Sequence, residues 1–160
     1  MMTEEKIVKI LLERGWKIAT AESCTGGIIA SRLVNVAGVS EAFDEGYITY
    51  ANAAKEKLLG VKRETLEKYG AVSEETAMEM AAGAVRAAKA DCSVVTTGIA
   101  GPGGGTPEKP VGLVYIAACV KGKTTVKKCF FEGDRLEVRT KAGQAALDFL
   151  LEKVIDEEDK

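Results

Sequence analysis

The chain has 160 residues, of which 46% are apolar, and this is enough to bury one core of normal size. We therefore expect residues 1–160 to form a single domain. The 22 basic and 24 acidic residues give a net charge of −2, which lacks the basic excess of a general nucleic-acid or anionic-membrane binder. The chain contains no histidine, so an activated serine or cysteine would need another kind of base.

The cysteines and the N-terminus indicate the compartment and the expected cofactors. The four cysteines are scattered without a C-x-x-C pair, and without histidine they make a poor set of zinc ligands. We expect no metal and no cofactor. The N-terminus lacks the apolar core of a signal peptide, and no stretch of about 18 apolar residues occurs. These features predict a cytoplasmic protein with reduced thiols, whose partners include neither membranes nor nucleic acids.

Hydrophobic periodicity and turn residues predict the secondary structure. The first half of the chain contains, in order, a helix at 4–14 capped by Thr3, a strand at 17–21, a helix at 26–36, a strand at 43–50, a helix at 51–59 and one or two helical turns at 63–69. The second half contains a helix from Ser73 to about Lys89, strands at 92–97, 111–120 and 124–131, and a helix at 135–154 before an acidic tail.

The element order α-β-α-β-α-α-β-β-β-α predicts the fold class. About five strands with helices available to both faces indicate a three-layer α/β/α sandwich around a mixed sheet. The strands on either side of Lys121-Gly122-Lys123 are expected to form an antiparallel hairpin. The glycine- and proline-rich residues 98–110 form a loop, and loops of this length are usually functional or mobile.

The segment Thr20-Ala21-Glu22-Ser23-Cys24-Thr25-Gly26-Gly27 has the character of an active-site turn. Ser23 lies between a strand and a helix, where free backbone N–H groups and the helix dipole suit an oxyanion or a phosphate. Gly26 and Gly27 would let a substrate approach the backbone closely. Ser23 or Thr25 could equally serve only as a helix cap, and Cys24 is either a rival nucleophile or a small buried side chain.

A serine nucleophile in a chain without histidine points to lysine as the base. The pKa of such a lysine would have to fall from about 10.4 by roughly three units, which corresponds to about 4 kcal/mol. Lys55 follows the second strand, with alanines before it and Leu58 and Leu59 one turn later, so its ammonium could be desolvated. By position alone, Lys57 and Lys62 have an equal claim.

Two further segments could bind a phosphorylated ligand. The glycine-rich residues 98–105 could wrap a nucleotide or simply connect two strands. Arg135 and Arg139 lie four residues apart at the start of the last helix, where guanidinium groups suit bidentate phosphate contacts. The alternative is a solvated helix start with Asp134 as its cap.

Several motifs together resemble one known family, that of the CinA C-terminal domain. They are, in order, A-E-S-C-T-G-G at 21–27, Y-A-N-A-A-K at 50–55, G-A-V-S-E at 70–74, T-G-I-A-G-P at 97–102, K-P-V-G at 109–112 and G-D-R at 133–135. The resemblance implies a fold like the anticodon-binding domain, with a mixed five-stranded sheet. It also implies the stand-alone form, without the molybdopterin-binding-like domain that many members carry. The family's known activity is hydrolysis of nicotinamide mononucleotide to nicotinic acid mononucleotide and ammonia, in pyridine nucleotide recycling, without a metal.

The resemblance also implies roles for individual residues. Ser23 matches the family's nucleophile and Lys55 its base, in an acyl-enzyme mechanism, and Tyr50 would orient Lys55 or relay a proton. The expected substrate-binding residues are Cys24, Thr25, Gly26, Gly27, Thr97, Gly98, Gly101, Arg135 and Arg139, and the choice between the two arginines stays open. Two alternatives to catalysis remain, a nucleotide-binding or regulatory module without turnover and an interaction protein linked to competence or DNA damage. A homodimer is expected because small enzymes of this kind often self-associate.

Overall fold

The computed structural model describes residues 1–158 and contains a five-stranded sheet of order β2-β1-β3-β4-β5. Strands β2, β1 and β3 run parallel, whereas β4 and β5 are antiparallel to their neighbours. In chain order the elements are α1 (Thr3–Arg14), β1 (Ile18–Glu22), α2 (Ile28–Val34), the 3₁₀ helix η1 (Val39–Glu41), β2 (Phe43–Ile48), α3 (Asn52–Leu59), α4 (Arg63–Tyr69), α5 (Glu74–Ala88), β3 (Cys92–Gly98), β4 (Leu113–Val120), β5 (Lys123–Phe130) and α6 (Arg135–Glu158).

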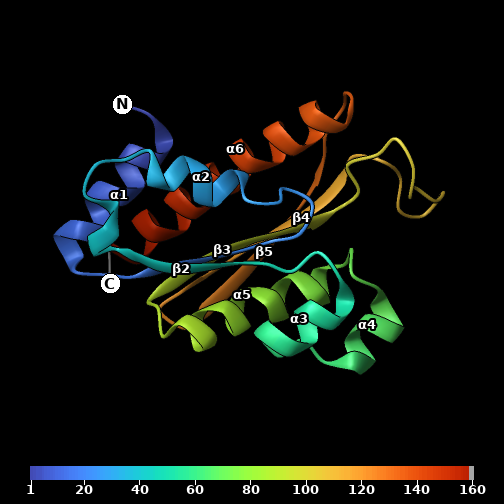
Figure 1. Ribbon diagram of the computed structural model, residues 1–160, viewed down its shortest axis with the longest axis horizontal. Coiled ribbons are helices and arrows are strands. Elements are labelled where there is room, and N and C mark those ends of the chain that lie inside the picture. Colours follow the sequence, from blue (N-terminus) through green and yellow to red (C-terminus); the bar gives the residue numbers. More distant parts are fainter. Residues whose placement is uncertain (159–160) are drawn as a thin grey trace.

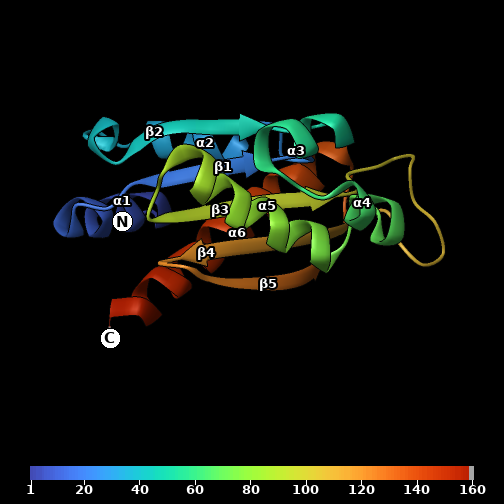
Figure 2. The same cartoon turned by 90° about the horizontal axis from the view of Figure 1, so that it is seen from below.

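Helices cover both faces of this sheet. Figure 1 shows α1, α2 and α6 on one face and α3, α4 and α5 on the other, and Figure 2 shows the order of the strands from below. One cluster of buried apolar side chains lies on each side of the sheet. Every residue of β1 is buried, as expected for a strand with helices on both sides. The predicted three-layer α/β/α sandwich with a mixed sheet is therefore confirmed.

The structure differs from the predicted elements at several places. The segment 63–69 forms helix α4, which the predicted element order did not count, and the turn η1 was not predicted. Helix α2 begins at Ile28 rather than at residue 26 because Gly26 and Gly27 have φ angles of +58° and +112° and belong to the preceding turn. The prediction of Thr3 as a helix cap was wrong, since Met2 is the cap and the Thr3 hydroxyl donates to Asp148 instead.

The last helix is longer than predicted. Helix α6 continues through the acidic residues to Glu158, whereas the pattern placed its end near residue 154. Lys153 pairs with Glu152 and Asp156, which reduces repulsion among the carboxylates of this end. The Val154 side chain is buried, and its carbonyl accepts a hydrogen bond from Arg14 of α1 at 3.0 Å. These contacts explain why the acidic segment is helical.

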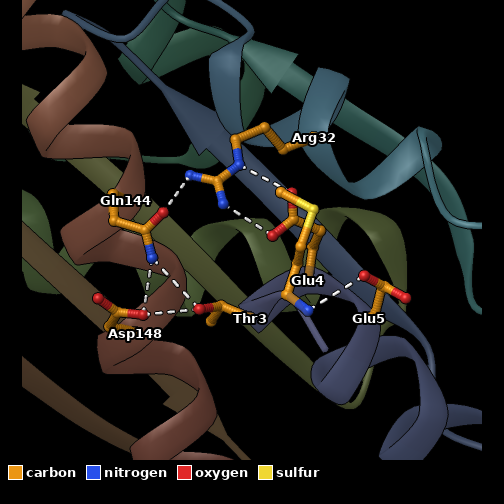
Figure 3. Close-up of polar contacts among 7 residues, drawn as sticks. Thr3, Glu4, Glu5, Arg32, Gln144 and Asp148 are labelled. Carbon is orange, nitrogen blue, oxygen red and sulfur yellow. Dashed lines mark hydrogen bonds and ion pairs between the residues drawn. The ribbon is translucent and has the colours of Figure 1, made fainter.

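Helix α2 is fixed to its neighbours by a polar network around Arg32 (Figure 3). The Arg32 guanidinium donates to both carboxylate oxygens of Glu4 in α1, at 2.9 and 2.7 Å, and to the Gln144 amide oxygen in α6. Glu4 is only 2% exposed, so this bidentate ion pair is shielded from water. The hydrogen bond from Arg32 lowers the pKa of the Glu4 carboxyl, which keeps it ionised. The network therefore joins the three helices on one face.

We expect Glu4→Gln to lower the free energy of unfolding by about 1 to 3 kcal/mol at neutral pH, because Arg32 loses its charged partner. The contribution of Glu4 is present above its ordinary pKa of 4.5 and is lost as pH falls through the lower value in the folded protein. Urea unfolding of both proteins from pH 7 to pH 3 measures this. The free energies of unfolding of wild type and Glu4→Gln should converge at acidic pH. A difference between them that is independent of pH would contradict the contribution of an ionised Glu4.

The topology places three strand ends at one edge of the sheet. Because β2, β1 and β3 are parallel, the residues that follow them lie side by side. The chain leaves β1 for α2 on one face and leaves β2 for α3 on the opposite face (Figure 1). Such a reversal creates a crevice at the carboxyl ends of the strands, where open α/β sheets bind ligands. Ser23 follows β1 and Lys55 follows β2 at this position.

Candidate active site

Ser23 lies at the end of β1, in a turn that leads into α2. Its backbone N–H donates to the Thr96 carbonyl of β3 at 3.1 Å, and its carbonyl accepts from the Gly26 N–H at 3.1 Å. Ser23 as a whole residue is 8% exposed. The two glycines that follow adopt left-handed conformations, which other residues enter only with strain. The turn therefore presents Ser23 in a fixed and nearly enclosed position.

Lys55 is buried beside Ser23. It lies in α3 with 1% exposure, and its Nζ is 3.3 Å from Ser23 Oγ and 2.7 Å from the carbonyl oxygen of Thr49, to which it donates. Burial lowers the pKa of the Lys55 ammonium, and the nearby Cys24 opposes this effect to a smaller extent. Among residues 1–158, no carboxylate lies within ion-pair distance of Nζ. Lys57 and Lys62 are exposed, so Lys55 is the one of these three lysines that is buried beside Ser23.

Cys24 has a different environment from Ser23. Its thiol is 6% exposed, and burial raises the pKa of the thiol to about 11, although a hydrogen bond with Thr96 acts in the opposite direction. The thiol is therefore protonated at neutral pH, and a thiol is a much weaker nucleophile than a thiolate. Ser23 Oγ, by contrast, lies 3.3 Å from the Lys55 amine.

A cavity of about 220 Å³ opens above the Ser23 and Lys55 side chains. The residues around it come from all three parallel strand ends, from α3, from the link between α4 and α5, and from α6. Its lining consists of Ser23, Cys24, Tyr50, Lys55, Ala71, Val72, Thr97, Gly98, Ala100 and Arg135. Thr97 also donates to the Ala71 carbonyl at 2.8 Å and so fixes one wall. The predicted residues Thr25, Gly26, Gly27, Gly101 and Arg139 lie outside this lining.

The two arginines of α6 have different environments. Arg139 donates from Nε and Nη2 to the carbonyls of Cys24 and Thr25, both at 3.0 Å, so its guanidinium binds the nucleophile turn itself. Arg135 is exposed, lines the cavity, and donates to the Gly101 carbonyl at 2.6 Å and to the Tyr50 hydroxyl at 2.9 Å. Arg135 is thus the arginine that a ligand in the cavity can reach.

Comparison with known proteins places the chain in a family. The model of the CinA C-terminal domain matches residues 2–154. The chain belongs to the CinA C-terminal domain family. A CinA-like protein of Kosmotoga olearia is 60% identical over 147 residues, which are 92% of this chain and 36% of that protein. A putative competence-damage inducible protein of Clostridium beijerinckii is 58% identical with the same coverage. The chain therefore spans about a third of the length of these curated relatives.

Solved structures of the same superfamily have the same fold. The competence/damage inducible protein CihA from Agrobacterium tumefaciens is 43% identical and superposes with a TM-score of 0.89, covering 92% of this chain and 90% of that one. A CinA superfamily protein from Klebsiella pneumoniae is 36% identical with a TM-score of 0.92 and covers 96% of both chains. The fold predicted from the CinA resemblance is thereby confirmed.

One residue of this CinA domain that sequence reasoning missed is Glu22. Its carboxylate is 1% exposed and accepts hydrogen bonds from the Thr25 hydroxyl and from the backbone N–H groups of Ile29 and Ala30. This carboxylate, rather than the side chain of Ser23 or Thr25, accepts from two N–H groups in the first turn of α2, whose N-cap Gly27 has no side chain for the purpose. The feature of the sequence that could have identified Glu22 is its position just before the start of a helix, where a carboxylate is stabilised.

Neither a metal centre nor a membrane span is evident in the part of the chain that is described. Residues 1–158 hold no cluster of three or more histidine, cysteine or acidic side chains suited to a metal ion. None of the described helices combines the length and apolar composition that crossing a bilayer requires.

Proposed function

We propose that this CinA-domain chain hydrolyses the carboxamide of nicotinamide mononucleotide, giving nicotinic acid mononucleotide and ammonia. The observation that carries the proposal is the buried Lys55 Nζ at 3.3 Å from Ser23 Oγ, at the floor of a ligand-sized cavity. A serine and a desolvated lysine form a known kind of hydrolytic pair that needs no histidine. The substrate follows from the resemblance to the CinA C-terminal domain family.

Proton transfer from Ser23 to Lys55 is the first step. In its neutral form Nζ has two protons and one lone pair, so it can donate to the Thr49 carbonyl and still accept the Ser23 proton. Burial favours this neutral form because it lowers the pKa of Lys55. Ser23 Oγ then attacks the carboxamide carbon, and the carbonyl oxygen becomes an oxyanion.

The backbone N–H of Cys24 stabilises the oxyanion in this proposal. Cys24 lines the cavity, and in the described residues its N–H donates to no acceptor of another residue. Donors of this kind are each worth about 3 to 4 kcal/mol in other hydrolases. The first N–H groups of α2 are not offered to the substrate, because the Thr25 carbonyl accepts from Ile28 and Glu22 accepts from Ile29 and Ala30.

Collapse of the tetrahedral intermediate completes the acylation half of the reaction. The Lys55 ammonium returns its proton to the amide nitrogen, the C–N bond breaks, and ammonia leaves a nicotinoyl ester on Ser23. Lys55, neutral again, takes a proton from water, whose oxygen attacks the ester. The C–O bond to Ser23 then breaks, Lys55 returns the proton to Oγ, and nicotinic acid mononucleotide is released.

Arg135 binds the 5′-phosphate in this arrangement, while Ala71, Val72 and Ala100 offer apolar surface to the pyridine ring. We expect Arg135→Ala to raise KM for nicotinamide mononucleotide by about 10- to 100-fold with a smaller change in kcat, because a charge-assisted contact is worth about 1.5 to 3 kcal/mol. Lys141→Ala, which removes an exposed cation elsewhere on α6, is the matched control. An unchanged KM in Arg135→Ala would show that this arginine does not bind the phosphate.

The test of the proposed function is ammonia release from nicotinamide mononucleotide by the purified protein, with chromatographic identification of nicotinic acid mononucleotide. Ser23→Ala serves as the inactive reference. Calorimetric binding of the nucleotide without ammonia release would reject turnover and favour a nucleotide-binding module. A cytoplasmic location and a homodimer stay predictions, which fractionation and light scattering can test.

A further inference from the structure

Glu22 is a buried acidic residue next to Ser23, and none of the proposed catalytic steps uses its carboxylate. We infer that Glu22 is a positioning residue, which holds the 23–27 turn in the conformation that aims Ser23 Oγ at Lys55 and fixes the orientation of the Cys24 N–H. The inference rests on the proposed Ser23 and Lys55 amidohydrolase site and extends it by one residue. Glu22 itself does not line the cavity, so it would act through Thr25 and helix α2.

The contacts of Glu22 join both ends of the turn. Oε1 accepts from the Thr25 hydroxyl at 2.6 Å and from the Ile29 N–H at 2.9 Å, and Oε2 accepts from the Ala30 N–H at 3.0 Å. Thr25 belongs to the turn, while Ile29 and Ala30 form the first turn of α2. One carboxylate at the end of β1 therefore fixes where the chain leaves the strand and where the helix begins.

Burying the Glu22 carboxylate has a desolvation cost that hydrogen bonds must offset. An ionised group in an apolar interior is costly unless hydrogen bonds satisfy it, and Glu22 has no arginine or lysine within ion-pair distance among residues 1–158. A neutral side chain could cap α2 at a smaller desolvation cost, as serine or asparagine does in most helices. The carboxylate instead accepts three hydrogen bonds at once, and these fix the turn more firmly than one cap would.

Thr25 extends the same network to β3. A carboxylate can only accept, so the Thr25 proton is directed at Glu22, and the Thr96 hydroxyl donates to Thr25 Oγ1 at 2.8 Å. The Thr96 carbonyl in turn accepts the Ser23 N–H. The path from Glu22 through Thr25 and Thr96 thus returns to the backbone of the nucleophile.

Arg139 holds the other side of the turn. It donates to the Cys24 and Thr25 carbonyls, and in a planar trans peptide the N–H of the next residue points the opposite way. The Thr25 N–H is therefore directed away from Arg139. The Ser23 carbonyl accepts from Gly26, which likewise fixes the direction of the Cys24 N–H. Glu22 and Arg139 together fix the orientation of these two N–H groups, and of the two residues it is Cys24 that lines the cavity.

Glu22→Gln tests the inference because it keeps the shape of the side chain but places an NH₂ group where the carboxylate accepted a hydrogen bond. We expect kcat for nicotinamide mononucleotide to fall by about 10- to 100-fold with KM within about twofold of wild type, since small displacements of a nucleophile have effects of this size. Thr25→Val should lower kcat in the same direction. The double variant should lose less than the product of the two single effects, because both act through one contact.

Glu4→Gln is the matched control. Glu4 is as buried as Glu22, at 2% against 1%, and it also anchors α2, but through Arg32 at the opposite end of that helix. If Glu22 had only a structural role, the two variants would lose similar stability in urea and would change kcat to a similar small extent. A selective loss of kcat in Glu22→Gln supports positioning, and equal kcat values for the two variants would overturn it.

A second readout separates this inference from the choice of substrate. A fluorophosphonate reagent labels an activated serine when Oγ displaces fluoride from phosphorus, so that a P–O bond forms, the P–F bond breaks and the base takes the proton. Glu22→Gln should slow labelling of Ser23 by the same factor as kcat. Wild-type protein that is labelled but releases no ammonia would reject the proposed substrate, and the labelling ratio would still decide the role of Glu22. Wild-type protein that is neither labelled nor active would overturn the inference.

Discussion

Ser23→Ala is expected to lower kcat for nicotinamide mononucleotide by about 10⁴-fold or more, because it removes the atom that forms the acyl-enzyme. Only Oγ is lost, and the walls of the cavity, from Ala71 to Arg135, remain. Binding should therefore persist, with a dissociation constant within about twofold of that of wild type. Ammonia release measures the first effect, and calorimetric titration with the nucleotide measures the second.

Cys24→Ala distinguishes the two neighbouring nucleophiles. Burial raises the pKa of the Cys24 thiol to about 11, so little thiolate exists at neutral pH. The substitution leaves the backbone N–H of residue 24 in place, and we therefore expect Cys24→Ala to keep its turnover of nicotinamide mononucleotide. If Ser23→Ala instead kept its turnover while Cys24→Ala lost it, the thiol would be the nucleophile and the assignment of Ser23 would be wrong.

The layers of the fold could be predicted because they follow from local patterns. Strands appear as short β-branched runs and helices as apolar stripes, and their order allows few arrangements. Position along the chain left Lys55 and Lys57 equal as candidates, and the burial of the two faces of α3 is what distinguishes them. Residues four apart share a helix face, so Lys55 lies with buried Leu59, whereas Lys57 lies on the exposed face of α3.

The contacts within the site could not be predicted in the same way. Arg135 and Arg139 share a face of α6, yet one helical turn separates them, and that shift brings one to Gly101 and the other to Cys24 and Thr25. Such a difference depends on how α6 lies against the sheet. Glu22 was missed for a related reason, because its hydrogen-bond donors at residues 29 and 30 approach it only after the glycine turn reverses the chain.

Lys55→Met is expected to lower kcat by about 10²- to 10⁴-fold, the usual contribution of a general base. Methionine has a similar length and is apolar, so the packing of α3 should be retained while the proton acceptor is lost. Lys57→Met on the exposed face of the same helix is the matched control and should keep its activity. Because Ser23 and Lys55 act as a unit, the double variant with Ser23→Ala should be no slower than the slower single variant. If the increases in activation free energy in the two single variants added up in the double variant, Ser23 and Lys55 would not act in the same catalytic step.

The charge state of Lys55 links activity to stability. Because burial lowers the pKa of this lysine, kcat/KM should rise with pH through that lowered value and then level off. At a pH below the folded-state pKa of Lys55, this lysine is protonated in both the folded and the unfolded chain. The difference in free energy of unfolding between wild type and Lys55→Met is then independent of pH. Between the folded-state pKa and the unfolded-state pKa of about 10.4, Lys55 is protonated only in the unfolded chain, so the free energy of unfolding of wild type rises relative to the variant by about 1.4 kcal/mol per pH unit. Urea unfolding and pH–rate profiles should therefore report one midpoint, since the same proton leaves the same amine in both. A rate that stays flat across the midpoint found by unfolding would show that Lys55 is not the base.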